Sequence, residues 1–256
     1  MNGFNIIAHR GAKACAPQNT MPSFMRAVAD GTDGFETDVH LTKDGIPVIC
    51  HNYTIDETSN GVGRIEDLTL EELNRFDFGI WYGEEYAGTK IPTLDTFLSF
   101  VKESDVRILN IEIKHPRSRL RELVEKTLQA VDAYGLTDRL IISSFSIPVL
   151  CHIKKVAPHI RTGLLYPSNN PAAAYPILWP ASMVRLTKCD AIHPIQDLVS
   201  APLVEWAHKK GLQVNVWTVN DAKNIERLLL LGVDSLITDD PANTRKVAES
   251  LLVSVR

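Results

Sequence analysis

Two carboxylates and an imidazole alternate along residues 35–40, and they are the side chains of this sequence best suited to chemistry. Glu36, Asp38 and His40 are separated by apolar or β-branched residues, as in a β-strand, where residues two apart point to the same side. Two carboxylates on one face of a buried strand repel each other unless a cation or a proton lies between them. The pair therefore predicts a metal site, with solvent-exposed carboxylates at a strand end as the alternative.

A third carboxylate, Glu112, comes near the end of another predicted strand, and Lys114 follows on the same face. With Glu36 and Asp38 it would supply three sets of oxygen ligands, which suit a hard divalent cation, Mg2+ or Ca2+. The ammonium group of Lys114 suits a phosphate oxyanion. The alternative for Glu112 and Lys114 is a plain ion pair, which contributes little at a strand end.

Two histidines and an arginine complete the set of reactive side chains. His9 and Arg10 close the first predicted strand, and His51 follows a later one. An imidazole has an ordinary pKa of about 6.5, so one can accept a proton while the other donates one. A guanidinium binds phosphate through paired hydrogen bonds. Metal, cations and an acid–base pair together indicate phosphoryl chemistry. The alternatives are structural histidines and a turn residue.

A repeating pattern of short apolar strands and amphipathic helices must position these residues. Strands are predicted for residues 4–8, 34–41, 46–50, 107–114, 140–145, 161–166, 191–195, 213–219 and 235–238. Helices are predicted for residues 21–29, 93–102, 120–134, 149–156, 203–210, 222–231 and 244–252, with a less regular one in the Pro-rich segment 172–184. Near-continuous apolar strands that alternate with helices are typical of a parallel sheet covered by helices.

The pattern predicts an α/β fold, specifically a (β/α)8 TIM barrel, since about eight such units fit a barrel of this length. An open, doubly wound sheet is the alternative, because periodicity does not indicate closure. In a barrel the active site lies at the carboxyl ends of the strands. All of the polar residues above fall at or toward strand ends, and none at strand beginnings.

Residues 52–92 interrupt this pattern. They contain no clear strand–helix pair, although Thr69-Leu70-Glu71-Glu72 has the form of a capping box that opens a short helix. We therefore expect residues 1–256 to form a single catalytic barrel domain, with residues 52–92 as a small insertion after the second strand, packed over the C-terminal end of the barrel.

The bulk properties limit the classes of partner. A net charge of −4 and a pI near 6.1 argue against nucleic acid. The four cysteines form no CxxC pair, which fits free thiols in a reducing compartment. No stretch approaches the about 18 apolar residues of a membrane span, and the N-terminus has no signal-peptide pattern. We expect a cytoplasmic protein without stable membrane insertion, and homo-oligomer formation is left open.

An ordered set of short motifs spans nearly the whole chain, and it resembles the glycerophosphodiester phosphodiesterase family. Each motif alone is weak, but their order is specific. They are His9-Arg10-Gly11, Ala16-Pro17-Gln18-Asn19-Thr20, Glu36-Thr37-Asp38-Val39, Thr42-Lys43-Asp44-Gly45, Thr58-Ser59-Asn60-Gly61, Ile91-Pro92-Thr93-Leu94, Ile111-Glu112-Ile113-Lys114, Ser143-Ser144-Phe145, Val216-Trp217-Thr218-Val219-Asn220 and Ile237-Thr238-Asp239-Asp240-Pro241.

The resemblance implies a (β/α)8 barrel that hydrolyses glycerophosphodiesters to glycerol 3-phosphate and an alcohol with a divalent cation. The small-molecule diester is then the expected partner. By position, the resemblance implies metal ligands at Glu36, Asp38 and Glu112, an acid–base pair at His9 and His51, and substrate contacts at Arg10, Asn19 and Lys114. Phe145 and Trp217 would form an apolar wall against the glycerol carbons, with ordinary core packing as the alternative.

Three positions depart from the family pattern, and two further functions remain open. Gln18 and Asn52 stand where the family usually has acids, and Glu57 stands where it usually has arginine. Gln and Asn keep the hydrogen-bonding reach of the acids but lose their charge. The three departures leave a weakly catalytic phosphate-binding protein as one alternative. The other is a lysophospholipase D that acts on lipid diesters, with residues 80–82 as an apolar surface. The resemblance does not say which histidine is the acid.

Overall fold

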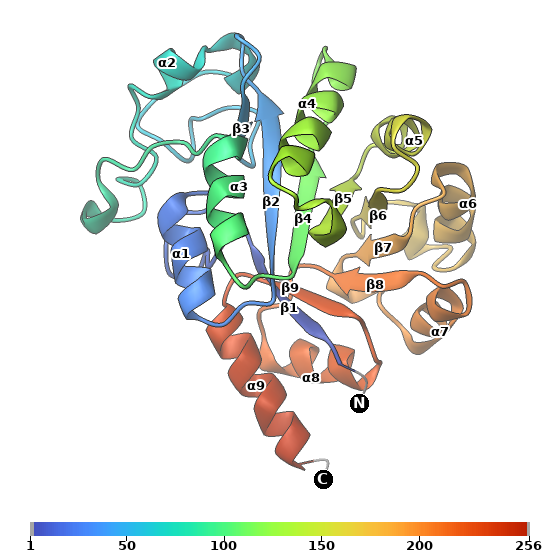
Figure 1. The fold of residues 1–256 in the computed structure, drawn as a ribbon. Coiled ribbons are helices and arrows are strands. Elements are labelled where there is room, and N and C mark those ends of the chain that lie inside the picture. Colours follow the sequence, from blue (N-terminus) through green and yellow to red (C-terminus); the bar gives the residue numbers. More distant parts are fainter. Residues whose placement is uncertain (1–2, 255–256) are drawn as a thin grey trace.

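Eight parallel strands close into a barrel with helices around its outside (Figure 1). The computed structural model describes residues 3–254. Hydrogen bonds connect the strands in the order β1-β9-β8-β7-β6-β5-β4-β2, and a further pairing of β1 with β2 closes the ring. The barrel strands are β1 (Asn5–His9), β2 (Gly34–Leu41), β4 (Ile108–Ile113), β5 (Leu140–Ser144), β6 (Arg161–Tyr166), β7 (Ala191–Pro194), β8 (Gln213–Val216) and β9 (Ser235–Thr238).

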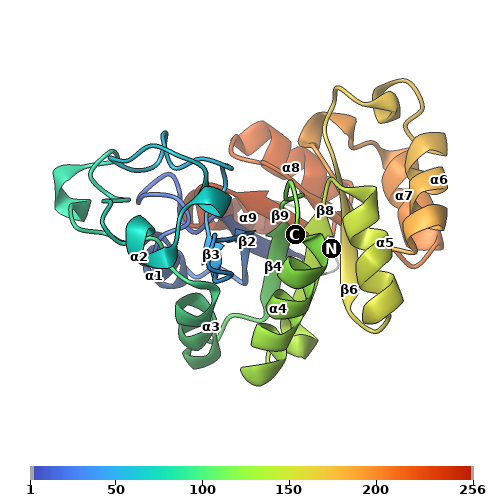
Figure 2. The same ribbon diagram turned by 90° about the horizontal axis from the view of Figure 1, so that it is seen from above.

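The TIM barrel prediction is confirmed, because an open sheet would lack the pairing of β1 with β2. Eight α-helices outside the segment between β3 and α3 cover the described barrel. They are α1 (Met21–Ala29), α3 (Leu94–Glu103), α4 (Leu120–Ala133), α5 (Ile147–Val156), α6 (Leu178–Thr187), α7 (Ala201–Lys209), α8 (Ala222–Leu230) and α9 (Pro241–Ser254). Seen from above, α4 to α8 lie around the strands (Figure 2).

Aromatic packing holds β2 against its covering helices. The rings of Phe24 on α1, Phe35 on β2 and Phe97 on α3 have centroids 4.4 to 5.7 Å apart, and all three side chains are fully buried. Such aromatic contacts stabilise beyond the area they bury. Phe35 points outward to the helices. Glu36 and Asp38, one and three residues further along the strand, therefore point to the inner side of the barrel.

The register between β2 and β4 brings distant acids together. Asp38 pairs with Glu112 and Glu36 pairs with Asn110 across the two parallel strands. A slip of one residue would turn these side chains toward the helices. The buried apolar residues on the other face of both strands therefore fix the position of the acids.

The segment between β3 and α3 has a small core of its own. β3 (Pro47–Ile49) runs antiparallel to β2, and η1 (Ile65–Asp67), α2 (Leu70–Leu73) and η2 (Glu84–Tyr86) follow. The predicted capping box is confirmed, since Thr69 and Glu72 bond each other's backbone N–H groups. The segment lies at the end toward which β2 and β4 point (Figure 1). The hydroxyl of Tyr86 donates to the carbonyl of Cys15, 2.8 Å away.

Three predicted boundaries of helices and strands are wrong, and prolines account for two of them. Segment 172–184 forms the 3-10 turn η4 (Pro171–Ala173) and then α6, which begins only at Leu178. Pro176 lies between them, and a proline disfavours helical conformation in the residue before it. α9 begins at Pro241 rather than Thr244, because proline is well suited to the first turn of a helix. β8 ends at Val216 rather than 219.

Inside the barrel, close packing lies beneath the site. Gly163 on β6 faces the imidazole of His193 so closely that an added Cβ would lie 2.4 Å from Nε2. The same nitrogen lies 3.0 Å from Nδ2 of Asn215. The carbonyl of His193 accepts a hydrogen bond of 2.7 Å from the indole N–H of Trp217. The backbone of His193 therefore holds the indole ring of Trp217 in place.

Among residues 3–254, no helix has both the length and the apolar character that crossing a bilayer requires.

Candidate active site

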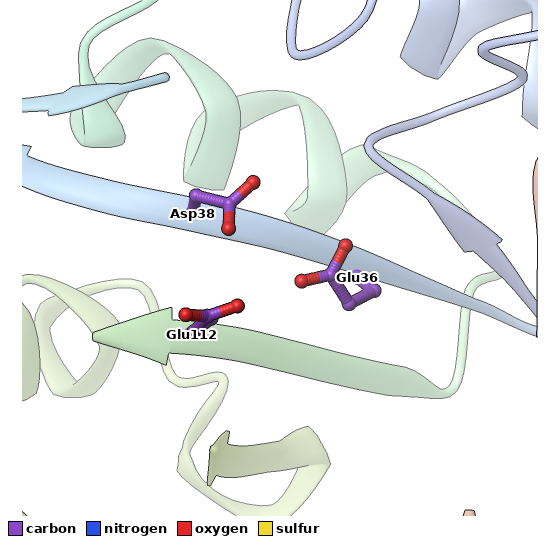
Figure 3. A group of neighbouring side chains, drawn as sticks. All are labelled: Glu36, Asp38 and Glu112. Carbon is purple, nitrogen blue, oxygen red and sulfur yellow. The ribbon is translucent and has the colours of Figure 1, made fainter. Parts of the chain in front are cut away.

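Three buried carboxylates meet at the carboxyl ends of β2 and β4. Glu36, Asp38 and Glu112 each offer an oxygen, and these atoms lie within 4.8 Å of one another. Figure 3 shows the three carboxyl groups around a common space. The residues are 5%, 0% and 6% exposed. Such a group of buried acids is costly unless cations compensate it.

Two cationic side chains border the three acids. The ammonium of Lys114 lies 2.9 Å from Oδ1 of Asp38 and 2.8 Å from Oε1 of Glu112. The Nε of Arg10 lies 3.6 Å from Oδ2 of Asp38. Burial would lower the pKa of Lys114, but the two carboxylates outweigh it and raise it. Lys114 therefore carries its charge inside the site.

The three acids differ in their tendency to ionise. Burial, with repulsion from the other two acids, raises the pKa of Glu36 well above its usual range. Burial raises the pKa of Glu112 to about 7, against the attraction of Lys114. Burial would also raise the pKa of Asp38, but Lys114 and Arg10 hold it below its usual range.

The acids fit a hard divalent cation. Oε2 of Glu36 is buried, and no hydrogen-bond partner for it exists among the described residues. Buried carboxylate oxygens are the donors that Mg2+ and Ca2+ take, and ionised carboxylates bind them better than neutral ones. Residues 36, 38 and 112 therefore provide a suitable donor set for such an ion.

We expect the thermal shift caused by Mg2+ or Ca2+ to increase with pH. The folded pKa values of Glu36 and Glu112 are raised, so without metal their neutral forms stabilise the fold. This contribution is lost as the pH rises through the raised pKa values, which for Glu112 is about 7. A bound cation favours the ionised forms. At about 100 times the dissociation constant it should raise the melting temperature by roughly 5–10 °C at high pH.

Differential scanning fluorimetry at about pH 5.5 and about pH 8 measures this difference. Sodium chloride of matched ionic strength is the control. Equal shifts at both pH values would contradict proton release from these carboxyl groups on binding.

His9 is oriented by a carboxylate from the last strand. Its Nδ1 lies 2.5 Å from Oδ1 of Asp239, which directly follows β9. Burial would raise the pKa of Asp239, but this hydrogen bond helps lower it to about 2, so the carboxylate accepts the proton of Nδ1. Nε2 of His9 then faces the site, 3.9 Å from Oε2 of Glu36. Burial lowers the pKa of His9 despite Asp239.

His51 is oriented by an amide instead. Its Nδ1 lies 2.6 Å from Oδ1 of Asn52, and Nδ2 of Asn52 donates to Oε2 of Glu57 at 2.7 Å. Burial lowers the pKa of His51 to about 4 against the attraction of Asp38. The imidazole is therefore neutral at neutral pH in this structure.

The loop after β1 presents Arg10 and Asn19. Arg10 donates to Oε1 of Gln18 at 2.6 Å, so a neutral acceptor orients the guanidinium. Gly11 is required here: its φ is +80°, and a Cβ would lie 2.4 Å from Oγ of Ser23. Asn19 donates to Oδ2 of Asp38 at 2.8 Å and accepts from Thr37 at 2.8 Å. Asn19 thus holds Asp38, and its substrate contact stays a prediction.

Two aromatic rings form a wall of the site. Phe145 and Trp217 pack edge to face, with centroids 5.5 Å apart and planes at 87°. Phe145 is 44% exposed, so it is not a core residue. Both rings line a cavity of about 90 Å³ together with His9, Arg10 and Glu36. The cavity has room for a few heavy atoms and offers one apolar side.

A larger cavity adjoins this one and leads outward. It has a volume of about 660 Å³ and shares His51, Glu112 and Phe145 with the smaller cavity. Its outer lining includes Tyr53 and Glu57 from the segment after β3. A molecule whose reacting atom lay in the small cavity would extend along this one.

The structure brings together all ten predicted site residues, namely His9, Arg10, Asn19, Glu36, Asp38, His51, Glu112, Lys114, Phe145 and Trp217. The roles given to them stay predictions. Sequence reasoning missed Asp239. This residue directly follows the last predicted strand, and the other site residues also lie at or toward the ends of strands. It also treated Glu57 as a departure rather than as a partner of Asn52.

A closed parallel barrel with acids, imidazoles and cations at one end of its strands defines a TIM-barrel enzyme. The sequence profile of the "Glycerophosphoryl diester phosphodiesterase family" matches residues 9–243. A glycerophosphodiester phosphodiesterase of Caldanaerobacter subterraneus is 40% identical over 236 residues, covering 92% of this chain and 94% of that protein. One of Bacillus altitudinis is 33% identical, covering 96% and 98%.

A solved structure agrees with these relatives. A phosphodiesterase of Oleispira antarctica, in complex with the product sn-glycerol-3-phosphate, has a TM-score of 0.87 at 28% identity, covering 96% of each chain. The chain therefore belongs to the glycerophosphodiester phosphodiesterase family, and it is a phosphoric diester hydrolase. The resemblance stated from the motifs is confirmed.

Proposed function

We propose that this enzyme hydrolyses small glycerophosphodiesters to glycerol 3-phosphate and an alcohol, with a divalent cation and two histidines. One observation carries the proposal: the two imidazoles and two buried carboxylates, Glu36 and Glu112, border the same small cavity. The third carboxylate, Asp38, has an oxygen within 4.8 Å of theirs. The product bound by the Oleispira phosphodiesterase supports the choice of substrate. A phosphodiester is an anion, so its recognition needs cations, and Arg10 and Lys114 lie at this cavity or beside its acids.

Glu36, Asp38 and Glu112 would hold the cation. When bound, it would neutralise charge on the phosphate oxygens. Arg10 would bind a phosphate oxygen, because its guanidinium lines the small cavity while Gln18 holds it. Lys114, which contacts Asp38 and Glu112 and lines the larger cavity, would add a second positive charge to hold the phosphate. Asn19 would act near the phosphate, from its position on Asp38.

His9 and His51 would exchange protons with the substrate. Each Nδ1 is engaged by Asp239 or Asn52, which leaves each Nε2 for the substrate. One histidine would take a proton from the nucleophile, either water or the glycerol hydroxyl beside the phosphate. The other would give a proton to the leaving alkoxide. Phe145 and Trp217 would contact the glycerol carbons.

The remaining expectations stand as proposals with separate support. We propose one catalytic domain over residues 1–256, with residues 52–92 as an insertion over the C-terminal end of the barrel. The cavity that Tyr53 and Glu57 share with strand-end residues supports this placement. All four cysteines are free, which supports a cytoplasmic setting.

Release of glycerol 3-phosphate from glycerophosphocholine tests the proposal. We expect product with Mg2+ or Ca2+ and none after chelation, measured with a coupled dehydrogenase assay. Choline release from a lysophospholipid, measured beside it, separates lipid diesters from small ones. Folded, metal-loaded protein that is inactive on every glycerophosphodiester would overturn the proposal.

A further inference from the structure

A chain of hydrogen bonds connects His51 to a surface carboxylate that does not touch it. His51 bonds Asn52 at 2.6 Å, and Asn52 bonds Glu57 at 2.7 Å. Glu57 is exposed at the wall of the larger cavity. No other hydrogen bond or ion pair of Glu57 is found among the described residues. Its defined partner is therefore the amide of Asn52.

The carboxylate determines which way the Asn52 amide points. An ionised carboxylate only accepts hydrogen bonds, so Asn52 must turn its NH2 group to Glu57. Its carbonyl oxygen then faces His51, and that oxygen also only accepts. Nδ1 of His51 must therefore carry the proton. Nε2 of the neutral ring is left with a lone pair on the side of the site.

The opposite amide orientation would favour the other tautomer of His51. With its NH2 group toward His51, Asn52 would donate to Nδ1, and the proton of the neutral imidazole would move to Nε2. Among residues 3–254 the side chain of Asn52 has hydrogen bonds to His51 and Glu57 alone, so the acceptor at position 57 distinguishes the two orientations. A hydrogen bond to a charged group favours one orientation by roughly tenfold or more.

We propose that Glu57 is a positioning residue that fixes the tautomer of His51 through the side chain of Asn52. The inference rests on the proposed proton transfer by His51. His9 needs no such relay, because Asp239 accepts its Nδ1 proton directly. His9 and His51 thus carry the proton on the same ring nitrogen, Nδ1, through different partners.

Glu57→Ala tests the relay by a signal that does not depend on turnover. In protein with 15N-labelled histidine, the ring nitrogens report which atom carries the proton, and the loss of one signal set in His51→Ala assigns His51 among the eight histidines. We expect the Nδ1–H form in the wild type and a mixture in Glu57→Ala. With glycerophosphocholine, kcat should fall by about two- to tenfold, because part of the population holds the wrong tautomer.

Two further variants separate positioning from other roles. Glu57→Gln keeps an acceptor, so its kcat should fall less than that of Glu57→Ala. Glu103→Ala removes an exposed acid at the end of α3 and should change neither tautomer nor kcat. If position 57 acted by charge alone on the substrate, the Gln and Ala variants would behave alike and KM would change instead.

A double substitution gives a reversal of sign. Asn52→Asp supplies a carboxylate that accepts from His51 without help, but it places two carboxylates side by side at positions 52 and 57. In that background Glu57→Ala should raise kcat, whereas in the wild type it lowers it. A loss in both backgrounds, or an unchanged His51 tautomer in Glu57→Ala, overturns the inference. Absence of hydrolysis by wild-type protein would instead overturn the proposed function and leave the tautomer measurement intact.

Discussion

Replacing His9 by alanine should lower kcat for glycerophosphocholine by about 10²–10⁴-fold, the usual contribution of a general acid or base. His9 borders the small cavity, and its Nε2 points to the site because Asp239 engages Nδ1. His51→Ala should cost a similar factor. The cation affinity of both variants should stay near that of the wild type, since neither histidine belongs to the group of three acids.

Steady-state kinetics together with calorimetric cation titration check this expectation. His159→Ala is a matched control, because His159 is exposed and lies outside both cavities. Unchanged turnover in His9→Ala and His51→Ala would remove both residues from proton transfer. A loss of cation affinity equal to the loss of rate would show that the substitution disturbs the acids instead.

Asp38→Asn should abolish cation-dependent activity and also weaken the fold. Asp38 is fully buried and lies between Lys114, Arg10 and Asn19. Its loss of charge leaves the buried Lys114 and the partly buried Arg10 without their shared partner. Breaking a buried ion pair from one side costs about 3–5 kcal/mol, which for a chain of this length lowers the melting temperature by roughly 10 °C.

The stability difference should depend on pH in a defined direction. Lys114 and Arg10 hold the pKa of Asp38 below its usual range despite burial. Its ionised form therefore stabilises the fold above the unfolded pKa of about 4, and the contribution is lost as the pH falls further. Melting curves of wild type and Asp38→Asn should converge in acid. Asp105→Asn, at an exposed position, is the control. Full cation-dependent turnover in Asp38→Asn would contradict the proposed metal site.

Much of the site could be predicted because strand polarity groups residues in space. Glu36 and Asp38 share a face by their spacing, and parallel strands bring their carboxyl ends to one end of the barrel. The pairing of Asp38 with Glu112 could not be predicted, because β2 and β4 are separated by residues 42–107 and their register depends on packing.

Two contacts of the site could not be predicted from the sequence, one because it depends on closure of the barrel and one because it depends on a loop. Asp239 reaches His9 only because β9 pairs with β1, and periodicity does not show which strands are neighbours. The partnership of Asn52 with Glu57 depends on loop conformation, which no hydrophobic pattern encodes. Read singly, each of these two residues looked like a lost or reversed charge, whereas together they form one hydrogen-bonded unit.

Gly163 has no side chain, and adding one would affect which substrates the site accepts. The ring of His193 occupies the space that a side chain there would fill, and the carbonyl of the same residue anchors the indole of Trp217. An alanine at position 163 would push on this support and move the aromatic wall, although it would never meet the substrate. Engineering of new specificities should therefore sample the barrel floor as well as the loops.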